Sequence, residues 1–246
     1  MLAAFCLRLA AGLVAALALL PASIIPPRFF RVQYLTALAL LTINFFFRPQ
    51  MHAMQMAVLG AAAFACFLGA IVWHTDEALG GVWLNRLTWI LFVAAIAQGA
   101  STFSPADEAW PILDHLTSAA LLGAALSSML MGHSYLIAPA MSMSPLLRLL
   151  AMFAVALALR IGVACYGLQG WWGSHSASPE NETLLWLGAR WLLGLVAPIV
   201  LGWMAWETAR IRSTQSATGI LYVVSILCFL GELLSLLLVS TTGYLL

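Results

Sequence analysis

Five ionisable residues lie inside long apolar segments of this sequence, where a charge is costly. Arg160, Arg190 and Glu232 stand in apolar surroundings, and Asp114 is followed directly by His115. Charged side chains within membrane-spanning segments usually face the interior of the bundle or a water-filled path, and they often bind ions or substrates. We therefore interpret Arg160, Glu232, Arg190 and Asp114 as buried polar residues with a functional role.

Arg160 and Glu232 are predicted to lie at a similar depth in the membrane. Each stands roughly 15 residues into a predicted helix, and at about 1.5 Å per residue both are ~22 Å from the same surface. One interpretation is an ion pair that clamps two helices together. The other interpretation is a proton or substrate site in the outer half of the bundle.

His115 and His133 share one apolar segment and are predicted to lie on one face of its helix. Their spacing corresponds to about five whole turns, which separates the two rings by ~27 Å along the axis. A ladder of small residues, which permits another helix or a flat ring to approach closely, runs beside that face. The ladder consists of Ala120, Ala124, Ser128 and Gly132.

His52 and His74 flank a second segment that is predicted to run in the same direction as the histidine helix. Pairing of His52 with His115 and of His74 with His133 gives two bis-histidine sites for haem b. The spacing of His115 and His133 is similar to that in the di-haem membrane subunits of respiratory nitrate reductases, and this resemblance of two residues implies haem b. These four histidines are the candidate cofactor ligands, either for haem or, through one of them, for quinone; we expect no metal beyond haem iron.

A polar segment at 207–219 is the most motif-like stretch of the chain. Arg210 and Arg212 precede three residues that can cap the next helix, Ser213, Thr214 or Ser216. Arg148 opens another predicted helix at the same surface. Free N–H groups beside guanidiniums favour an anion, such as a lipid headgroup phosphate, a haem propionate or a partner's carboxylate. The alternative is an ordinary positively charged loop.

The elements that position these residues are predicted from composition. Hydrophobic residues make up 63% of the 246 residues and charged residues 8%, and the chain contains no lysine. A helix needs about 20 apolar residues to cross a bilayer. We predict an all-α, polytopic membrane bundle that forms a single domain over residues 1–246. Its eight helices are expected at 4–21, 32–47, 54–73, 85–104, 111–136, 146–169, 184–206 and 217–242.

The first segment also resembles a secretory signal, because Arg8 precedes an apolar run and Pro21-Ala22-Ser23. It lacks a good A-x-A cleavage site, so we expect it to remain as a helix. Arginines near the membrane concentrate on the cytoplasmic side. With both termini outside, only Arg48 faces outward, whereas the inner side receives Arg28, Arg31, Arg86, Arg148, Arg210 and Arg212.

Two main function classes fit these observations. The first is a membrane subunit of a respiratory or photosynthetic-type electron-transfer complex, which anchors a redox partner and holds haem b or quinone. The alternative is a small-solute or ion transporter that uses Arg160, Arg190 and Glu232, or a non-catalytic assembly subunit. Common catalytic motifs are absent, and whether the protein is an enzyme stays open. We expect it in a bacterial inner membrane with other membrane or peripheral subunits, and a net charge of +1 indicates no nucleic-acid partner.

Overall fold

The computed structural model describes residues 1–47, 51–75, 80–100, 109–138, 141–174 and 181–246. All regular secondary structure within these ranges is helical. The elements are α1 (Leu2–Leu19), α2 (Pro27–Phe47), α3 (Ala53–Val72), α4 (Gly81–Ala100), α5 (Ala109–Ile137), α6 (Ser144–Ser174), α7 (Asn181–Trp191), the π-helical turn η1 (Leu192–Val196), α8 (Ala197–Arg210) and α9 (Thr214–Thr242).

Eight helices in the described part of the chain are long and apolar enough to cross a membrane, as predicted. Together α7, η1 and α8 form one of these spans, at Asn181–Arg210. The second span is longer than the predicted 32–47, because α2 begins at Pro27, a residue whose fixed φ suits the first helical turn. Arg31 therefore lies inside α2, whereas Arg48 is outside the described residues.

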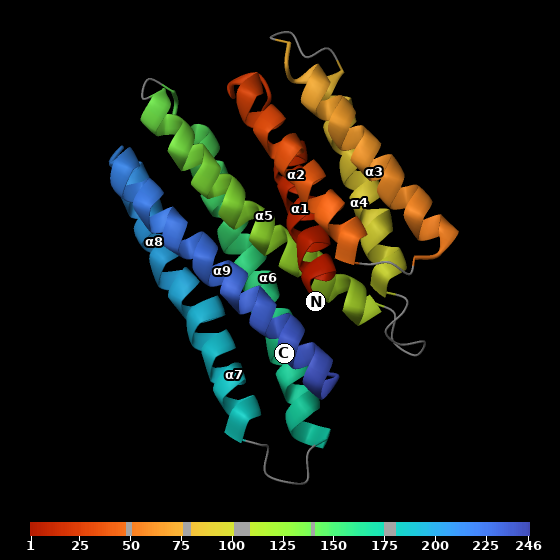
Figure 1. The fold of residues 1–246 in the computed structure, drawn as a ribbon. Coiled ribbons are helices and arrows are strands. Elements are labelled where there is room, and N and C mark those ends of the chain that lie inside the picture. Colours follow the sequence, from red (N-terminus) through yellow and green to blue (C-terminus); the bar gives the residue numbers. More distant parts are fainter. Residues whose placement is uncertain (48–50, 76–79, 101–108, 139–140, 175–180) are drawn as a thin grey trace.

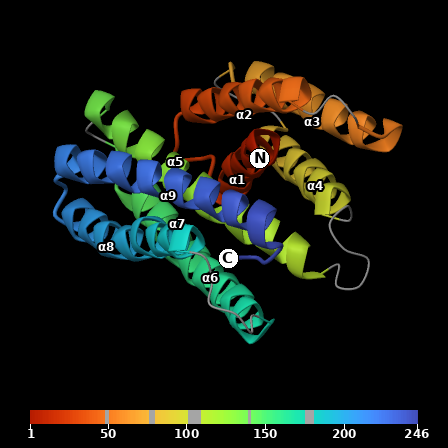
Figure 2. The same ribbon diagram turned by 60° about the horizontal axis from the view of Figure 1, so that its bottom comes forward.

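Helices α1 and α5 form the centre of the bundle. On one side α1 packs against α2 and α4, and α3 closes this group by packing on α2 and α4. On the other side α5 packs against α6 and α9, and α8 packs on both of these helices. Figures 1 and 2 show these two groups on either side of the α1–α5 pair. The N-terminus and the C-terminus lie toward the same end of the bundle (Figure 1).

The crossing of α1 and α5 is a backbone contact between glycines. A Cβ added to Gly12 would overlap the carbonyl group of Ala119, and one added to Gly123 would overlap the backbone of Gly12. Small residues let two membrane helices approach this closely. Ala120 and Ala124 of the predicted ladder each follow one residue after this contact, at Ala119 and Gly123. Gly132, the last residue of the ladder, lies against Thr218 of α9.

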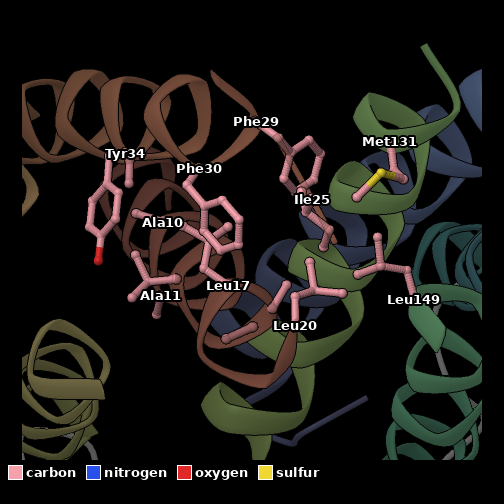
Figure 3. Close-up of a cluster of buried hydrophobic side chains, with 14 of the residues drawn as sticks. Ala10, Ala11, Leu17, Leu20, Ile25, Phe29, Phe30, Tyr34, Met131 and Leu149 are labelled. Carbon is pink, nitrogen blue, oxygen red and sulfur yellow. The ribbon is translucent and has the colours of Figure 1, made fainter. Parts of the chain in front are cut away.

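An apolar core fills the space between α1, α2, α5 and α6 (Figure 3). Phe30 of α2 stacks on Trp73, with ring centroids 4.0 Å apart. Beside this stack, the Tyr34 hydroxyl and the Trp73 indole N–H both donate to Oδ1 of buried Asn85, at 2.8 and 3.1 Å. This bonding holds α2, α4 and the end of α3 together. Nδ2 of Asn85 also donates to the carbonyl of Leu17 at 3.4 Å, which ties α4 to α1.

Candidate functional site

Five charged side chains from five different spans meet inside the bundle. Arg8 comes from α1, Asp114 from α5, Arg160 from α6, Arg190 from α7 and Glu232 from α9. None of these residues is more than 2% exposed. We call this group, together with His115, the arginine–carboxylate cluster. The cluster contains all four buried polar residues that were predicted from the sequence, and it adds Arg8, which was not predicted.

Asp114 is held by two arginines. One carboxylate oxygen accepts a hydrogen bond from Nη2 of Arg8 at 2.8 Å, and the other accepts from Nη1 of Arg160. A carboxylate can accept two guanidinium groups in this way because each oxygen carries two lone pairs. Asp114 therefore links α1 to α6 through α5.

Glu232 is the second carboxylate of the cluster. Its Oε1 accepts from Nε of Arg160 and from Nη2 of Arg190, both at 2.9 Å. Arg160 therefore bridges Asp114 and Glu232, and its third bond goes to the Ser235 hydroxyl at 2.9 Å. Ser235 in turn donates to the carbonyl of Leu246 at 2.6 Å. The ion pair expected between α6 and α9 is thus part of a larger network.

His115 faces the same network from the next position on α5. Nη2 of Arg8 lies 2.5 Å from Nδ1 of His115. The same Nδ1 lies 3.4 Å from Oδ2 of Asp114, so the ring contacts both members of the Arg8–Asp114 ion pair. The His115 side chain is 14% exposed, which makes it the most accessible member of the cluster. His115 therefore connects the buried charges to the less buried part of the bundle.

The cluster carries more positive than negative charge. Among the side chains of the described residues, three guanidiniums face two carboxylates, which gives the cluster one excess positive charge. Several buried atoms have no hydrogen-bond partner among the described residues: Nε and Nη1 of Arg8, Nε and Nη1 of Arg190, and Oε2 of Glu232. Nη1 of Arg8 lies 3.8 Å from Oε2 of Glu232, which is too far for a hydrogen bond. A buried charge without a counter-charge is costly, so this arrangement favours a bound anion.

The π-helical turn η1 positions Arg190. Pro198 has no N–H, so the carbonyl of Gly194 lacks the donor that an α-helix supplies four residues later. Just before it, the N–H of Ala197 bonds to the carbonyl of Leu192, five residues earlier, which is the π-helical pattern. Beside this turn Gly194 touches Gly231 of α9, where a Cβ added to either glycine would collide with the other backbone. This close approach places the Arg190 guanidinium against Glu232 on the neighbouring helix.

A cavity of about 260 Å³ adjoins the cluster at the end of the bundle that holds the chain termini. We call it the terminal cavity. One wall carries Arg8, Asp114 and His115, and the other is apolar and aromatic, with Leu236 and the stacked pair Trp110–Tyr166. The rings of that pair are nearly parallel, with centroids 3.8 Å apart. Two larger cavities, of about 380 and 680 Å³, are lined by apolar side chains and glycine only.

The other three candidate histidines lie elsewhere. His52 is the exposed N-cap residue of α3, and His133 is exposed near the end of α5. His74 is also exposed, and its Nδ1 lies 2.8 Å from Nη1 of Arg31 on α2. Since α3 packs on α2 and α4, the described contacts join neither His52 to His115 nor His74 to His133. The described residues also contain no group of three or more metal-binding side chains.

The predicted anion patch lies on the surface at the opposite end of the bundle. Arg148, Arg210 and Arg212 are exposed, and Arg210 forms only a long contact of 3.5 Å with Glu207. Ser213 occupies the N-cap position of α9, but its side chain makes no capping hydrogen bond. The connection that precedes Ser213 turns at Arg212, whose φ is +59°.

Arg8 is the residue of the cluster that sequence reasoning missed. It is an arginine inside an apolar run, the same signal that singled out Arg160 and Arg190, but the run also resembles a secretory signal. In the structure Arg8 contacts Asp114 and His115 and lines the terminal cavity.

No family model, curated protein or solved structure matches this chain. Inference about its function therefore rests on the geometry of the cluster and the cavity.

Proposed function

We propose that this protein is a membrane carrier for a small anion and that the arginine–carboxylate cluster is its binding site. The observation that carries the proposal is the excess positive charge of the buried cluster, together with the unpartnered nitrogen atoms of Arg8 and Arg190 among the described residues. Ionisable residues inside membrane spans commonly mark substrate or ion paths. A bound monoanion would neutralise the cluster and so remove the cost of its excess buried charge.

The arrangement of helices supports a carrier built from two groups. The cluster draws one residue from each of α1, α6, α7 and α9, and two from α5, so a relative movement of these helices changes the cluster directly. Arg8 belongs to α1, which also packs on α2 and α4. A shift at the glycine contact between α1 and α5 would move Arg8 relative to Asp114 and so alter how tightly the anion is held.

We further propose that the eight spans lie in the inner membrane of a bacterium with both termini outside. The exposed arginines Arg148, Arg210 and Arg212 then lie on the cytoplasmic side, as the distribution of positive charge predicts. The terminal cavity opens toward the outer side in this orientation.

Cysteine labelling tests the orientation. In a Cys165→Ser background, which removes the exposed native thiol, single cysteines at Ser142 and Thr214 should react only after the membrane is permeabilised. A cysteine at Asn181 should react with a membrane-impermeant maleimide in intact cells. The reverse pattern would invert the orientation and place the terminal cavity on the inner side.

Uptake into proteoliposomes tests the carrier. Labelled benzenesulfonate and chloride are suitable probes, because both stay ionised and cross protein-free bilayers slowly. With an inside-positive potential set by potassium and valinomycin, we expect uptake about tenfold above that of protein-free liposomes, a difference equal to ~1.4 kcal/mol in the barrier. Arg190→Met balances the charge of the cluster and should remove this uptake.

Arg28→Gln is the matched control, since Arg28 is exposed and lies outside the cluster. It should transport like the wild type. If neither anion enters faster than into empty liposomes, or if Arg190→Met transports normally, the carrier proposal is wrong.

A second candidate, a quinone-binding membrane subunit of an electron-transfer complex, is favoured by the aromatic wall of the terminal cavity. There the His115 ring lies on one wall of the cavity, and Trp110 and Tyr166 provide a flat apolar surface opposite it. Binding of haem b is a weaker proposal, because the histidine pairs that it needs are not brought together among the described contacts. A visible absorbance spectrum of the purified protein and an extraction for quinone test both cofactors.

A further inference from the structure

We infer that the anion recognised by this protein is a monovalent organic acid with a small, flat apolar body, bound in the terminal cavity. The inference rests on the proposed function and specifies its substrate class. It comes from the shape and lining of the cavity, whereas the proposed function comes from the charge of the cluster.

The charge of the ligand follows from the charge of the cluster. One negative charge balances the excess, whereas a dianion would leave the buried site with an excess negative charge. Arg8 is the guanidinium that lines the cavity and has two nitrogen atoms, Nε and Nη1, without a hydrogen-bond partner in the described part of the chain. Nε and Nη1 lie on different edges of the guanidinium, so each can donate one hydrogen bond to an oxygen of a carboxylate or sulfonate.

The apolar body follows from the opposite wall. Trp110 and Tyr166 stack in near-parallel planes beside Leu236, and the rest of this wall is aliphatic or glycine. Cavities of about 150 Å³ bind benzene, so a volume of about 260 Å³ holds one ring and a carboxylate. Inorganic anions would leave this apolar surface uncovered and gain nothing from it.

The position of the cavity gives the orientation of the ligand. Its lining comes from the beginnings of α1 and α5 and from the end of α9, whereas Arg160, Arg190 and Glu232 lie deeper in the bundle. The acid group therefore points inward to Arg8 and His115, and the apolar body lies between the aromatic pair and Leu236. In this orientation the acid group also lies beside the His115 ring.

Binding to the protein in lipid nanodiscs, followed by calorimetry or by the shift in thermal unfolding, tests this inference. The ligands are benzoate, its neutral analogue benzamide, the dianion phthalate, acetate and chloride. We expect benzoate to bind about tenfold more tightly than each of the others. Ala4→Phe fills the cavity from α1 without touching the charges, and it should weaken benzoate about tenfold while changing acetate binding less than about twofold.

The outcomes separate the two proposals. If acetate or chloride binds as tightly as benzoate, and Ala4→Phe has no effect, the substrate class is wrong and the anion site stands. If none of the anions binds, the anion site itself is wrong. If benzamide or a neutral quinone binds as tightly as benzoate, charge plays no part and the quinone-binding candidate takes its place.

Discussion

Replacing Glu232 by glutamine is expected to destabilise the protein by about 3–5 kcal/mol, the usual cost of removing one partner from a buried ion pair. Glu232 accepts hydrogen bonds from both Arg160 and Arg190, and its loss raises the excess positive charge of the cluster from one to two. The change in volume is small, so the effect isolates the charge. Reversible unfolding in mixed micelles, followed by circular dichroism, measures the difference.

Arg190→Met is the informative comparison, because it removes a charge of the opposite sign from the same pair. It leaves two arginines and two carboxylates, with Glu232 still bonded to Arg160 at 2.9 Å. We expect a loss of about 1 kcal/mol or less, since an apolar side chain replaces the surplus charge. If both substitutions cost the same, the cluster has no excess charge to balance.

Gly12→Val is expected to cost about 3 kcal/mol or more and to lower the yield of folded protein. The new side chain would overlap the backbone of α5 at Ala119 and Gly123, and backbone cannot move aside by changing rotamer. Separating α1 from α5 also moves Arg8 away from Asp114, so anion binding should fall in any protein that folds.

Gly60→Val is the matched control, because Gly60 also lies within a long apolar helix but a Cβ there meets nothing within 4 Å. It should change stability by less than about 0.5 kcal/mol, as surface substitutions usually do. Equal losses at Gly12 and Gly60 would show that α1 and α5 do not cross in close backbone contact.

The spans could be predicted because an apolar run of about 20 residues has the length that crosses a bilayer and too few polar groups for a surface in water. The meeting of Arg160 and Glu232 was also foreseeable, since two helices in the same direction place equal counts of residues at equal depth. Arg190, with Pro198 eight residues later, carried a weaker signal of a distorted helix. The length of a span and the depth of a residue within it follow from the rise per residue along a single helix.

Which helices touch could not be predicted in the same way. The pairing of His52 with His115 assumed that α3 lies beside α5, but α3 packs on α2 and α4. The closest approach of α5 is at Gly123, not along the ladder from Ala120 to Gly132, because the position of the crossing depends on both helices. Arg8 was missed for a local reason, since its position near the beginning of an apolar run imitates a signal segment.

The excess positive charge of the cluster is tested most directly by equilibrium dialysis of labelled benzenesulfonate against the protein in nanodiscs, with wild type and Arg190→Met compared at the same concentration. We expect saturable binding of about one anion per chain by the wild type, because one charge is in excess, and no saturable binding by Arg190→Met. Saturable binding of equal strength by both proteins, or none by the wild type, would contradict an anion site built on that charge.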